Sequence, residues 1–333
     1  MGLGMPGLVY VIIPFLFAVG LVRKFREYQW GYCKSKSSLN GKVFIVTGAN
    51  SGIGKETVRE LARRKARVIM ACRDLKNAKN AIEEIRRDVS SGELIPMLLD
   101  LESLESVRRF AKEVLRDFPN INVLINNAGV SVPVCQHRKT KDGYEINFGV
   151  NHLGHFLLTN LLLPRLKDST SSRIVIVSSM LHERGTIDFD NLNGEKGFAG
   201  AGRRMNPAYC NSKLANMLFN IELSKRIEGT GVDSFALCPG FVYKNLFRYS
   251  NVKWYHYILF LPVALFFMRT PSQGAQTTLY CATSEELEGK SGLFFRNCNF
   301  YGPKMEFDPA VAKKLWEVSE NMVGLNNDKS ETM

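Results

Sequence analysis

The chain has 333 residues, 45% of them hydrophobic and 23% charged, which is typical of a folded globular protein and excludes a disordered, collagen-like or coiled-coil chain. Its 44 lysine and arginine residues against 32 acidic residues give a formal net charge of +12. The basic residues are scattered, and no zinc-finger, RNP-type or basic-zipper motif accompanies them. Nucleic acid is therefore not predicted as a partner.

The cysteines and histidines favour neither disulfides nor a metal. The seven cysteines are odd in number, widely spaced and contain no Cys-x-x-Cys pair, which argues against a disulfide framework and a zinc ribbon. Unpaired cysteines suit a reducing compartment. His152 and His155 lie three residues apart without a third ligand at a matching spacing. Helix packing is the better interpretation of this pair, and no metal site is predicted.

The N-terminal segment has the length and flanking charge of a membrane anchor. Leu3 to Val22 is a run of 20 uncharged residues, and at about 1.5 Å per residue it would cross a bilayer core roughly 30 Å thick. Arg23, Lys24 and Arg26 follow the run, whereas a cleaved signal peptide carries its charges before it. Because positive flanks stay cytosolic, we predict that residues 1–38 are an uncleaved transmembrane anchor with the body in the cytosol. A buried N-terminal helix is the alternative.

From Asn40 onward, short apolar runs alternate with windows of helical period. The predicted strands are 42–47, 67–72, 96–99, 122–126, 173–178 and 232–237, and the predicted helices are 55–65, 75–89, 104–118, 144–166 and 209–227. This alternation indicates βαβ units, and so an α/β fold with a doubly wound parallel sheet. We assign residues 39–310 to a single domain and residues 311–333 to a C-terminal helix and tail.

A second apolar stretch, Trp254 to Met268, is short for a membrane span and is interrupted by Pro262. It is either a buried helix over a pocket or an apolar lid at the membrane interface.

A glycine-rich turn follows the first predicted strand and precedes a helix. It reads Thr47-Gly48-Ala49-Asn50-Ser51-Gly52-Ile53-Gly54. Glycines let the backbone turn tightly and approach a pyrophosphate, whose charge is favoured at a helix N-terminus. The spacing differs from Gly-x-Gly-x-x-Gly, and alone it is a weak indication of a nucleotide site.

Polar residues at three further positions complete a pattern. Tyr209 and Lys213 are four residues apart, so they share a helix face where an ammonium favours the phenolate. Ser178-Ser179 ends the fifth predicted strand and Asn126-Asn127 ends the fourth. Carboxyl ends of parallel strands face the ligand crevice. Each signal is weak, but their order along the chain is specific.

With these motifs in this order, the chain resembles the short-chain dehydrogenase/reductase family from Leu39 to about Gly302, which implies a Rossmann-type fold. Four segments resemble the branch of membrane-anchored retinol dehydrogenases. They are residues 71–74, 148–156, 209–216 and 284–291.

The resemblance implies a role for each matching residue. The family's four catalytic residues are matched by Asn151, Ser179, Tyr209 and Lys213. Ser179 would bond the substrate oxygen, Tyr209 would move the proton, and Asn151 would place a water. Lys213 would lower the Tyr209 pKa and hold the nicotinamide ribose. The other implied contacts are to the cofactor: Gly48, Ser51, Gly52, Ile53 and Gly54 at the pyrophosphate, Asp100 and Leu101 at the adenine, Asn127 at the adenine ribose, and Pro239 and Gly240 at the nicotinamide.

Two departures from the family pattern stand near the site. Lys244 replaces the threonine of Pro-Gly-x-Val-x-Thr, which puts the grip on the nicotinamide carboxamide in doubt. The stretch between Ser179 and Tyr209, including Gly197 to Arg204, is longer than usual and would alter substrate choice.

The residues after the second strand favour NADP(H). An NAD site usually has a carboxylate directly after the second strand, where it bonds the ribose hydroxyls. Here Arg73 occupies this position and Asp74 follows it. Because arginine pairs well with phosphate, we predict that Arg73 holds the 2′-phosphate.

The predicted function is an NADP-dependent oxidoreductase that interconverts a lipophilic alcohol and its aldehyde or ketone, with retinol and retinal the first pair. Steroid, isoprenoid or fatty alcohols are alternatives, and so is a catalytically silent nucleotide-binding membrane protein. The predicted location is the endoplasmic reticulum membrane, with a mitochondrial membrane or lipid droplet as alternatives, and a homodimer is left open.

Overall fold

The computed structural model describes residues 5–169, 171–198, 206–242, 266–302 and 304–326. Within them, one eight-stranded sheet has the order β3-β2-β1-β4-β5-β6-β7-β8. Strands β1 to β7 are parallel, and β8 pairs antiparallel with β7. The strands are β1 Val43–Thr47, β2 Arg67–Cys72, β3 Glu93–Leu98, β4 Val123–Asn126, β5 Ser172–Val177, β6 Val232–Cys238, β7 Phe294–Arg296 and β8 Asn299–Phe300.

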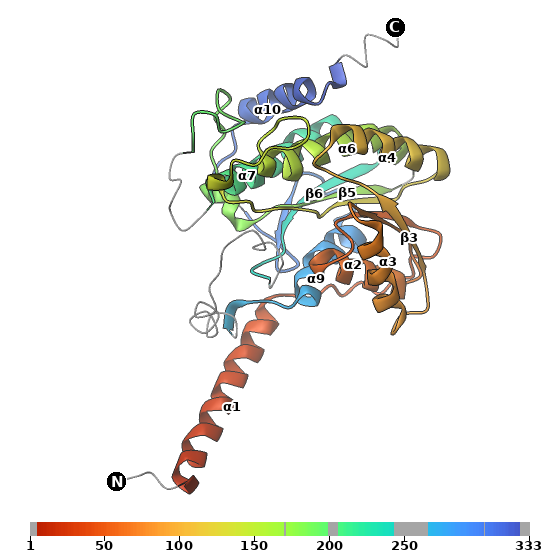
Figure 1. The fold of residues 1–333 in the computed structure, drawn as a ribbon. Helices are drawn as coiled ribbons and strands as arrows, with labels where there is room; N and C mark the ends of the chain where they lie inside the picture. Colours follow the sequence, from red (N-terminus) through yellow and green to blue (C-terminus); the bar gives the residue numbers. More distant parts are fainter. Residues whose placement is uncertain (1–4, 170, 199–205, 243–265, 303, 327–333) are drawn as a thin grey trace.

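Helices cover both faces of the sheet (Figure 1). On one face lie α4 Leu104–Asp117, α6 Gly154–Asp168, α7 Pro207–Arg226 and α10 Pro309–Met322, and on the other lie α2 Gly52–Arg63, α3 Leu75–Arg86 and α9 Pro271–Thr283. The central strands β1 and β4 are buried along their whole length because both faces are covered, which explains why they read as continuous apolar runs. The predicted Rossmann-type doubly wound fold is confirmed.

One predicted element is divided. The sequence predicts a single helix over 144–166, but the structure has a short α5 Ile146–Phe148, a π-turn Gly149–Leu153 and then α6. In the π-turn the Gly154 N–H bonds the Gly149 carbonyl, five residues back. Such turns are rare and occur mostly at functional sites.

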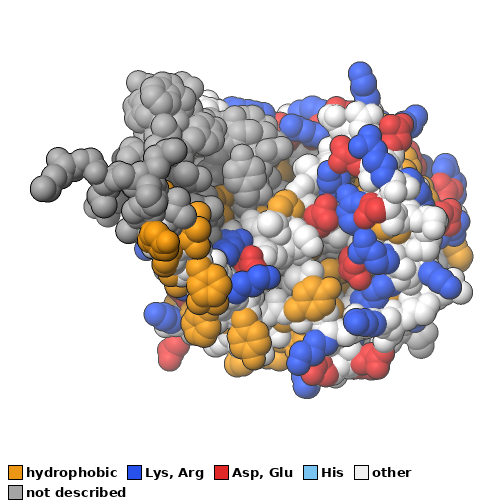
Figure 2. Space-filling view, turned by 90° about the horizontal axis from the view of Figure 1, so that it is seen from below, with side chains coloured by type: hydrophobic (Ala, Val, Ile, Leu, Met, Phe, Trp, Pro, Cys, Tyr) orange, Lys and Arg blue, Asp and Glu red, His pale blue; other side chains and the backbone are white. Residues whose placement is uncertain are grey.

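The N-terminal helix α1 Met5–Gln29 points away from the body (Figure 1). Large apolar side chains along it are exposed, among them Tyr10, Phe17 and Phe25. Seen along this end of the molecule, hydrophobic side chains gather beside lysines and arginines (Figure 2). None of the helices in the described ranges combines the length and the apolar character needed to cross a membrane.

Several predicted features lie partly or wholly outside the described residues. The predicted membrane span begins at Leu3, and residues 1–4 are not described. Residues 243–265 are not described either, and they hold Lys244 and most of the second apolar stretch.

Candidate active site

The turn after β1 has the backbone that its glycines allow. Gly48 has φ +64° and Gly52 has φ +54°, both in the left-handed region that favours glycine. A Cβ on Gly54 would lie 2.3 Å from the Gly48 carbonyl oxygen, so no larger residue fits there. Helix α2 begins at Gly52, and its N-cap residue Ser51 makes no capping bond with its side chain. This helix N-terminus is suited to bind an anion.

A cavity of about 690 Å³ lies at the carboxyl ends of the central strands. It is positioned where the strand order reverses between β1 and β4, which is where open α/β sheets bind ligands. Most of the predicted cofactor residues line it: Gly48, Ser51, Gly52, Ile53, Gly54, Arg73, Asp100, Leu101, Asn127, Tyr209 and Lys213. The structure therefore brings together residues as far apart in the sequence as Gly48 and Lys213.

At the adenine end the carboxylate of Asp74 is already engaged. It caps α3, with the Asn77 N–H donating to Oδ1 (3.1 Å) and the Asn77 side-chain amide donating to Oδ2 (2.6 Å). Arg73 is half-exposed at the cavity rim, and its Nη1 lies 3.1 Å from Oε1 of Glu102. Arg73 and Asp74 both line the cavity here, and the Asp74 carboxylate also stabilises the start of a helix.

Tyr209 and Lys213 come from the N-terminal half of α7, which Asn206 caps by accepting the Tyr209 N–H (3.3 Å). Lys213 Nζ lies 5.6 Å from the centre of the Tyr209 ring and donates to the Val177 carbonyl (2.9 Å). Both side chains are buried but reach the cavity. The i, i+4 spacing thus places them as the sequence predicts.

Burial is the largest influence on the protonation of Tyr209. Burial raises the pKa of the Tyr209 phenol, and a hydrogen bond with the Ser179 side chain opposes this by lowering the pKa. In this structure the Lys213 ammonium donates to the Val177 carbonyl.

Comparison with known proteins identifies the family. A model of the short chain dehydrogenases matches residues 42–191. Human retinol dehydrogenase 11 is 45% identical over 322 residues, which cover 96% of this chain and 98% of that protein. The chain belongs to the short-chain dehydrogenase/reductase family. Its branch is that of the retinol dehydrogenases, since human retinol dehydrogenase 14 is also 48% identical, over 86% of this chain and 88% of that protein.

Solved structures agree with this family. An uncharacterised protein from Mycobacterium paratuberculosis has a TM-score of 0.66 and 36% identity, covering 86% of this chain and 95% of that one. A short chain dehydrogenase from Shigella flexneri 2a, solved with NADP, has a TM-score of 0.61 over 80% of this chain and 100% of that one; its 21% identity supports the fold alone. As a short-chain dehydrogenase, this chain binds NAD(P)(H), and the glycine cradle and the 690 Å³ cavity fit a dinucleotide.

Asn151 of this dehydrogenase has its side-chain amide fully engaged. Its Oδ1 accepts the Val130 N–H (2.8 Å), while its Nδ2 donates to the Val130 carbonyl (2.9 Å) and to Ser212 Oγ (2.9 Å). The side chain therefore braces the loop after β4 against α7. Its neighbour Val150, rather than Asn151, lines the cavity.

Three other predicted residues lie just outside the cavity lining. Ser179 follows β5 and accepts the Leu181 N–H (3.2 Å), while its neighbour Ser178 lines the cavity. Pro239 and Gly240 follow β6 under the side chain of Arg269, whose Nη1 donates to the Pro239 carbonyl (3.3 Å). Gly240 has φ +85°, and a Cβ there would lie 2.5 Å from Arg269 Nε.

Sequence reasoning missed two residues of this site. The Thr47 hydroxyl accepts the N–H groups of Asn127 and Ala128, both at 2.9 Å, and so ties the end of β1 to the end of β4. Pro271, the first residue of α9, lines the cavity. Thr47 stands inside the glycine motif, and the sequence Thr270-Pro271 before Gln273 is a helix-start signal. Both residues could therefore have been predicted from the sequence.

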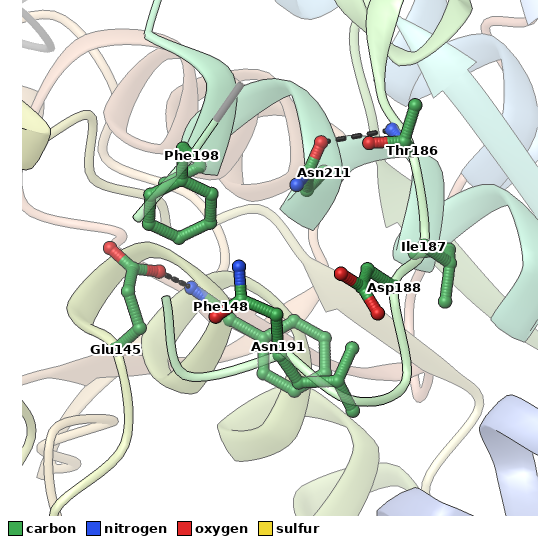
Figure 3. Close-up of a pocket in the computed structure, with 10 residues that line it drawn as sticks. Glu145, Phe148, Thr186, Ile187, Asp188, Asn191, Phe198 and Asn211 are labelled. Atoms are coloured by element: carbon green, nitrogen blue, oxygen red, sulfur yellow. Dashed lines mark hydrogen bonds between the residues drawn. The ribbon is translucent and has the colours of Figure 1, made fainter. Parts of the chain in front are cut away.

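Described residues of the segment between Ser179 and Tyr209 border a small pocket (Figure 3). Its volume is about 10 Å³, enough for roughly one water molecule. The Thr186 N–H donates to Asn211 Oδ1 (2.9 Å) and the Phe148 N–H to Glu145 Oε2 (2.7 Å) on opposite walls. The part of the segment predicted to affect substrate choice, Gly197 to Arg204, lies outside the described residues from 199 onward.

Proposed function

We propose that this short-chain dehydrogenase uses NADP(H) to interconvert a lipophilic alcohol and its aldehyde or ketone, with retinol and retinal as the first pair. The observation that carries the proposal is the buried Tyr209–Lys213 pair at the wall of the dinucleotide cavity, in a chain 45% identical to a retinol dehydrogenase. Steroid, isoprenoid and fatty alcohols are the other substrate classes.

The roles of the residues follow from their places. When bound, the nicotinamide supplies or accepts the hydride. Ser179 holds the substrate oxygen, and Tyr209 gives that oxygen a proton in reduction or takes it in oxidation. Because burial raises its pKa, the phenol is protonated near neutral pH, which is the form needed for reduction. The Lys213 ammonium, fixed on the Val177 carbonyl, is positioned to hold the ribose and to stabilise the phenolate that forms.

The NADP preference rests on the adenine end. Arg73 supplies a guanidinium for the 2′-phosphate, while each oxygen of Asp74, which also lines the cavity, already accepts one hydrogen bond from Asn77 in capping α3. Glu102 holds Arg73 and Arg138 at 3.1 and 3.2 Å, so the phosphate would share these guanidiniums with one carboxylate.

We further propose that the apolar run from Leu3 to Val22, most of which lies in α1, anchors the enzyme in the endoplasmic reticulum membrane with the body in the cytosol. The exposed apolar side chains of α1 and the basic residues Arg23, Lys24 and Arg26 at its end support this address. A mitochondrial membrane or a lipid droplet is the alternative location.

The test is a substrate panel on the full-length chain in detergent. All-trans-retinal, a steroid ketone, an isoprenoid aldehyde and a fatty aldehyde are each offered with NADPH and with NADH. We expect the highest kcat/KM for retinal with NADPH. Turnover of none of them would contradict the enzyme assignment, and preference for another class would replace the substrate.

A further inference from the structure

A buried histidine joins the cofactor turn to the π-turn of Asn151. His155 lies in the first turn of α6 and is 2% exposed. Its Nδ1 is 3.1 Å from the Asn151 carbonyl oxygen, and its Nε2 is 2.9 Å from Thr47 Oγ1. The imidazole therefore bridges the end of β1, where the glycine turn begins, and the segment that carries Asn151, to which the family resemblance assigns the placing of a water.

The bonds of Thr47 decide which nitrogen carries the proton. A hydroxyl has one hydrogen and two lone pairs, and both lone pairs of Thr47 accept backbone N–H groups, from Asn127 and Ala128. The hydroxyl can therefore only donate to His155 Nε2, since the other acceptor, the Ile125 carbonyl, is farther away at 3.4 Å. The proton of the neutral ring must then lie on Nδ1, where it is donated to the Asn151 carbonyl.

The surroundings keep this ring uncharged. Burial lowers the pKa of His155 to about 4, with the bond to the Asn151 carbonyl raising it and the nearby Lys213 ammonium lowering it further. A second proton on Nε2 would also point at a hydroxyl oxygen whose lone pairs are already used. The His155 imidazole therefore keeps one protonation state across the neutral pH range, and the donor and acceptor of each of its two hydrogen bonds stay the same.

We propose that His155 is a positioning residue: as a neutral Nδ1–H imidazole it fixes the Asn151 carbonyl to Thr47, so that the π-turn and the cofactor turn keep a single relative geometry. The proposal rests on the proposed function. It concerns Asn151 through its backbone carbonyl, because the side-chain amide already bonds Val130 and Ser212.

The first test reads the proton directly and needs no substrate. The chain has only five histidines, so ¹⁵N-histidine labelling of the full-length protein in detergent gives few imidazole signals. We expect one ring in the Nδ1–H form that stays neutral from pH 7 down to about 5 and is missing from the His155→Asn spectrum. An Nε2–H ring, or proton uptake at His155 in that range, would overturn the bridge.

The second test separates positioning from stability. His155→Leu removes both bonds, whereas His155→Asn puts an amide N–H near the place of Nδ1 and restores the donation to Asn151. We expect His155→Leu to lower kcat about tenfold or more, with cofactor KM changing less, while both variants lose similar thermal stability. His155→Asn keeps the bond to Asn151 but not the bond to Thr47, so its kcat should lie between those of His155→Leu and the unmodified chain. His152→Asn is the control, since His152 is equally buried on the preceding turn but bonds Ser319 of α10 (2.9 Å).

The outcomes are distinct. Wild-type kcat in His155→Leu, or a kcat that only follows the melting temperature in all three variants, would overturn positioning. If the unmodified chain reduces no lipophilic carbonyl, the proposed function fails, whereas the imidazole spectrum still decides whether the Thr47–His155–Asn151 bridge exists.

Discussion

At the scale of single residues, Tyr209 is the group whose removal tests the chemistry. Tyr209→Phe deletes one oxygen from a buried ring and leaves its packing in place. Because proton transfer by a placed group contributes about 10²–10⁴-fold, we expect kcat to fall by that factor while NADPH affinity stays within about threefold. Steady-state assays measure kcat, and NADPH fluorescence titration measures the cofactor affinity. Tyr32→Phe, at an exposed tyrosine, is the control, and a near wild-type rate for Tyr209→Phe would refute the assigned mechanism.

Arg73 tests the choice of cofactor. Arg73→Ala removes the guanidinium at the rim of the adenine end and leaves the Asp74 cap of α3 untouched. A charged hydrogen bond contributes roughly 1.5–3 kcal/mol, so we expect the NADPH-to-NADH ratio of kcat/KM to fall at least about tenfold. Arg87→Ala, at an exposed arginine after α3, should leave the ratio unchanged. The same ratio in Arg73→Ala would remove Arg73 from this role.

The identity of these residues follows from local motifs, but their hydrogen-bond partners do not. The spacing of Tyr209 and Lys213 is enough to place both on one helix face. Nothing in the sequence near Asn151 shows that Val130 and Ser212 occupy its amide, because these partners come from 21 and 61 positions away along the chain. The same holds for the Tyr209 pKa, because the burial that raises it most comes from the whole fold.

At the scale of elements, the apolar runs predict the first six strands of the parallel sheet but neither β7 nor the π-turn. Gly149 to Leu153 are all buried and include no proline or charge, so the extra residue in this turn has no local signature. The helix α9 was missed for another reason. Its start carries a capping box, in which Thr270 and Gln273 bond each other's backbone. The helix has no strong apolar stripe, so the capping residues alone did not lead to a predicted helix.

The end of α1 is fastened to the beginning of α9. Arg23 lies over the buried Trp30 ring at 4.6 Å and donates to the Met268 carbonyl (2.9 Å), while Arg269 lies over the same ring at 5.1 Å. Arg269 is itself buried, and it bonds the Pro239 carbonyl in the loop assigned to the nicotinamide. The N-terminal helix thus contacts, through one tryptophan and one arginine, the loop that follows β6.

This connection predicts an effect on cofactor binding. Arg269→Met keeps much of the side-chain volume but loses the bond to Pro239, so we expect NADPH to bind about tenfold more weakly. Trp30→Leu, which removes the ring beneath Arg269, should weaken binding in the same direction but less. Fluorescence titration of NADPH measures both, with Lys313→Met on the exposed side of α10 as the control. Unchanged affinity in Arg269→Met would show that the loop holds its conformation without this arginine.

At the scale of the whole molecule, charge is distributed unevenly along the chain. No acidic residue occurs from Ser234 to Ser284, and Glu27 is the one acidic residue before Glu56. These two regions meet where α1 joins the body, since Arg23 contacts Met268. The exposed apolar side chains of α1 and the basic residues beside them lie at that end of the molecule (Figure 2). An apolar helix with arginines and a lysine near its end is the pattern expected of a protein held at an anionic membrane.

The last prediction is the topology in that membrane. Arg23, Lys24 and Arg26 end the apolar helix, and Lys34 and Lys36 follow within the next ten residues, so the positive-inside rule keeps this side and the attached body in the cytosol. We expect protease added to intact microsomes to degrade a tag at Met333, whereas a tag before Met1 is protected. We also expect alkaline carbonate to leave the full-length chain in the pellet.

The matched control for this experiment is a variant that changes only the flanking charge. Replacing Arg23, Lys24 and Arg26 with glutamine leaves the apolar run of Leu3 to Val22 intact and removes the determinant of orientation. If flanking charge sets the topology, a fraction of this variant will show the opposite protection pattern while still resisting carbonate extraction. Protection of the Met333 tag in the unmodified chain would overturn the orientation. Release of that chain by carbonate would overturn the anchor itself, whatever the orientation.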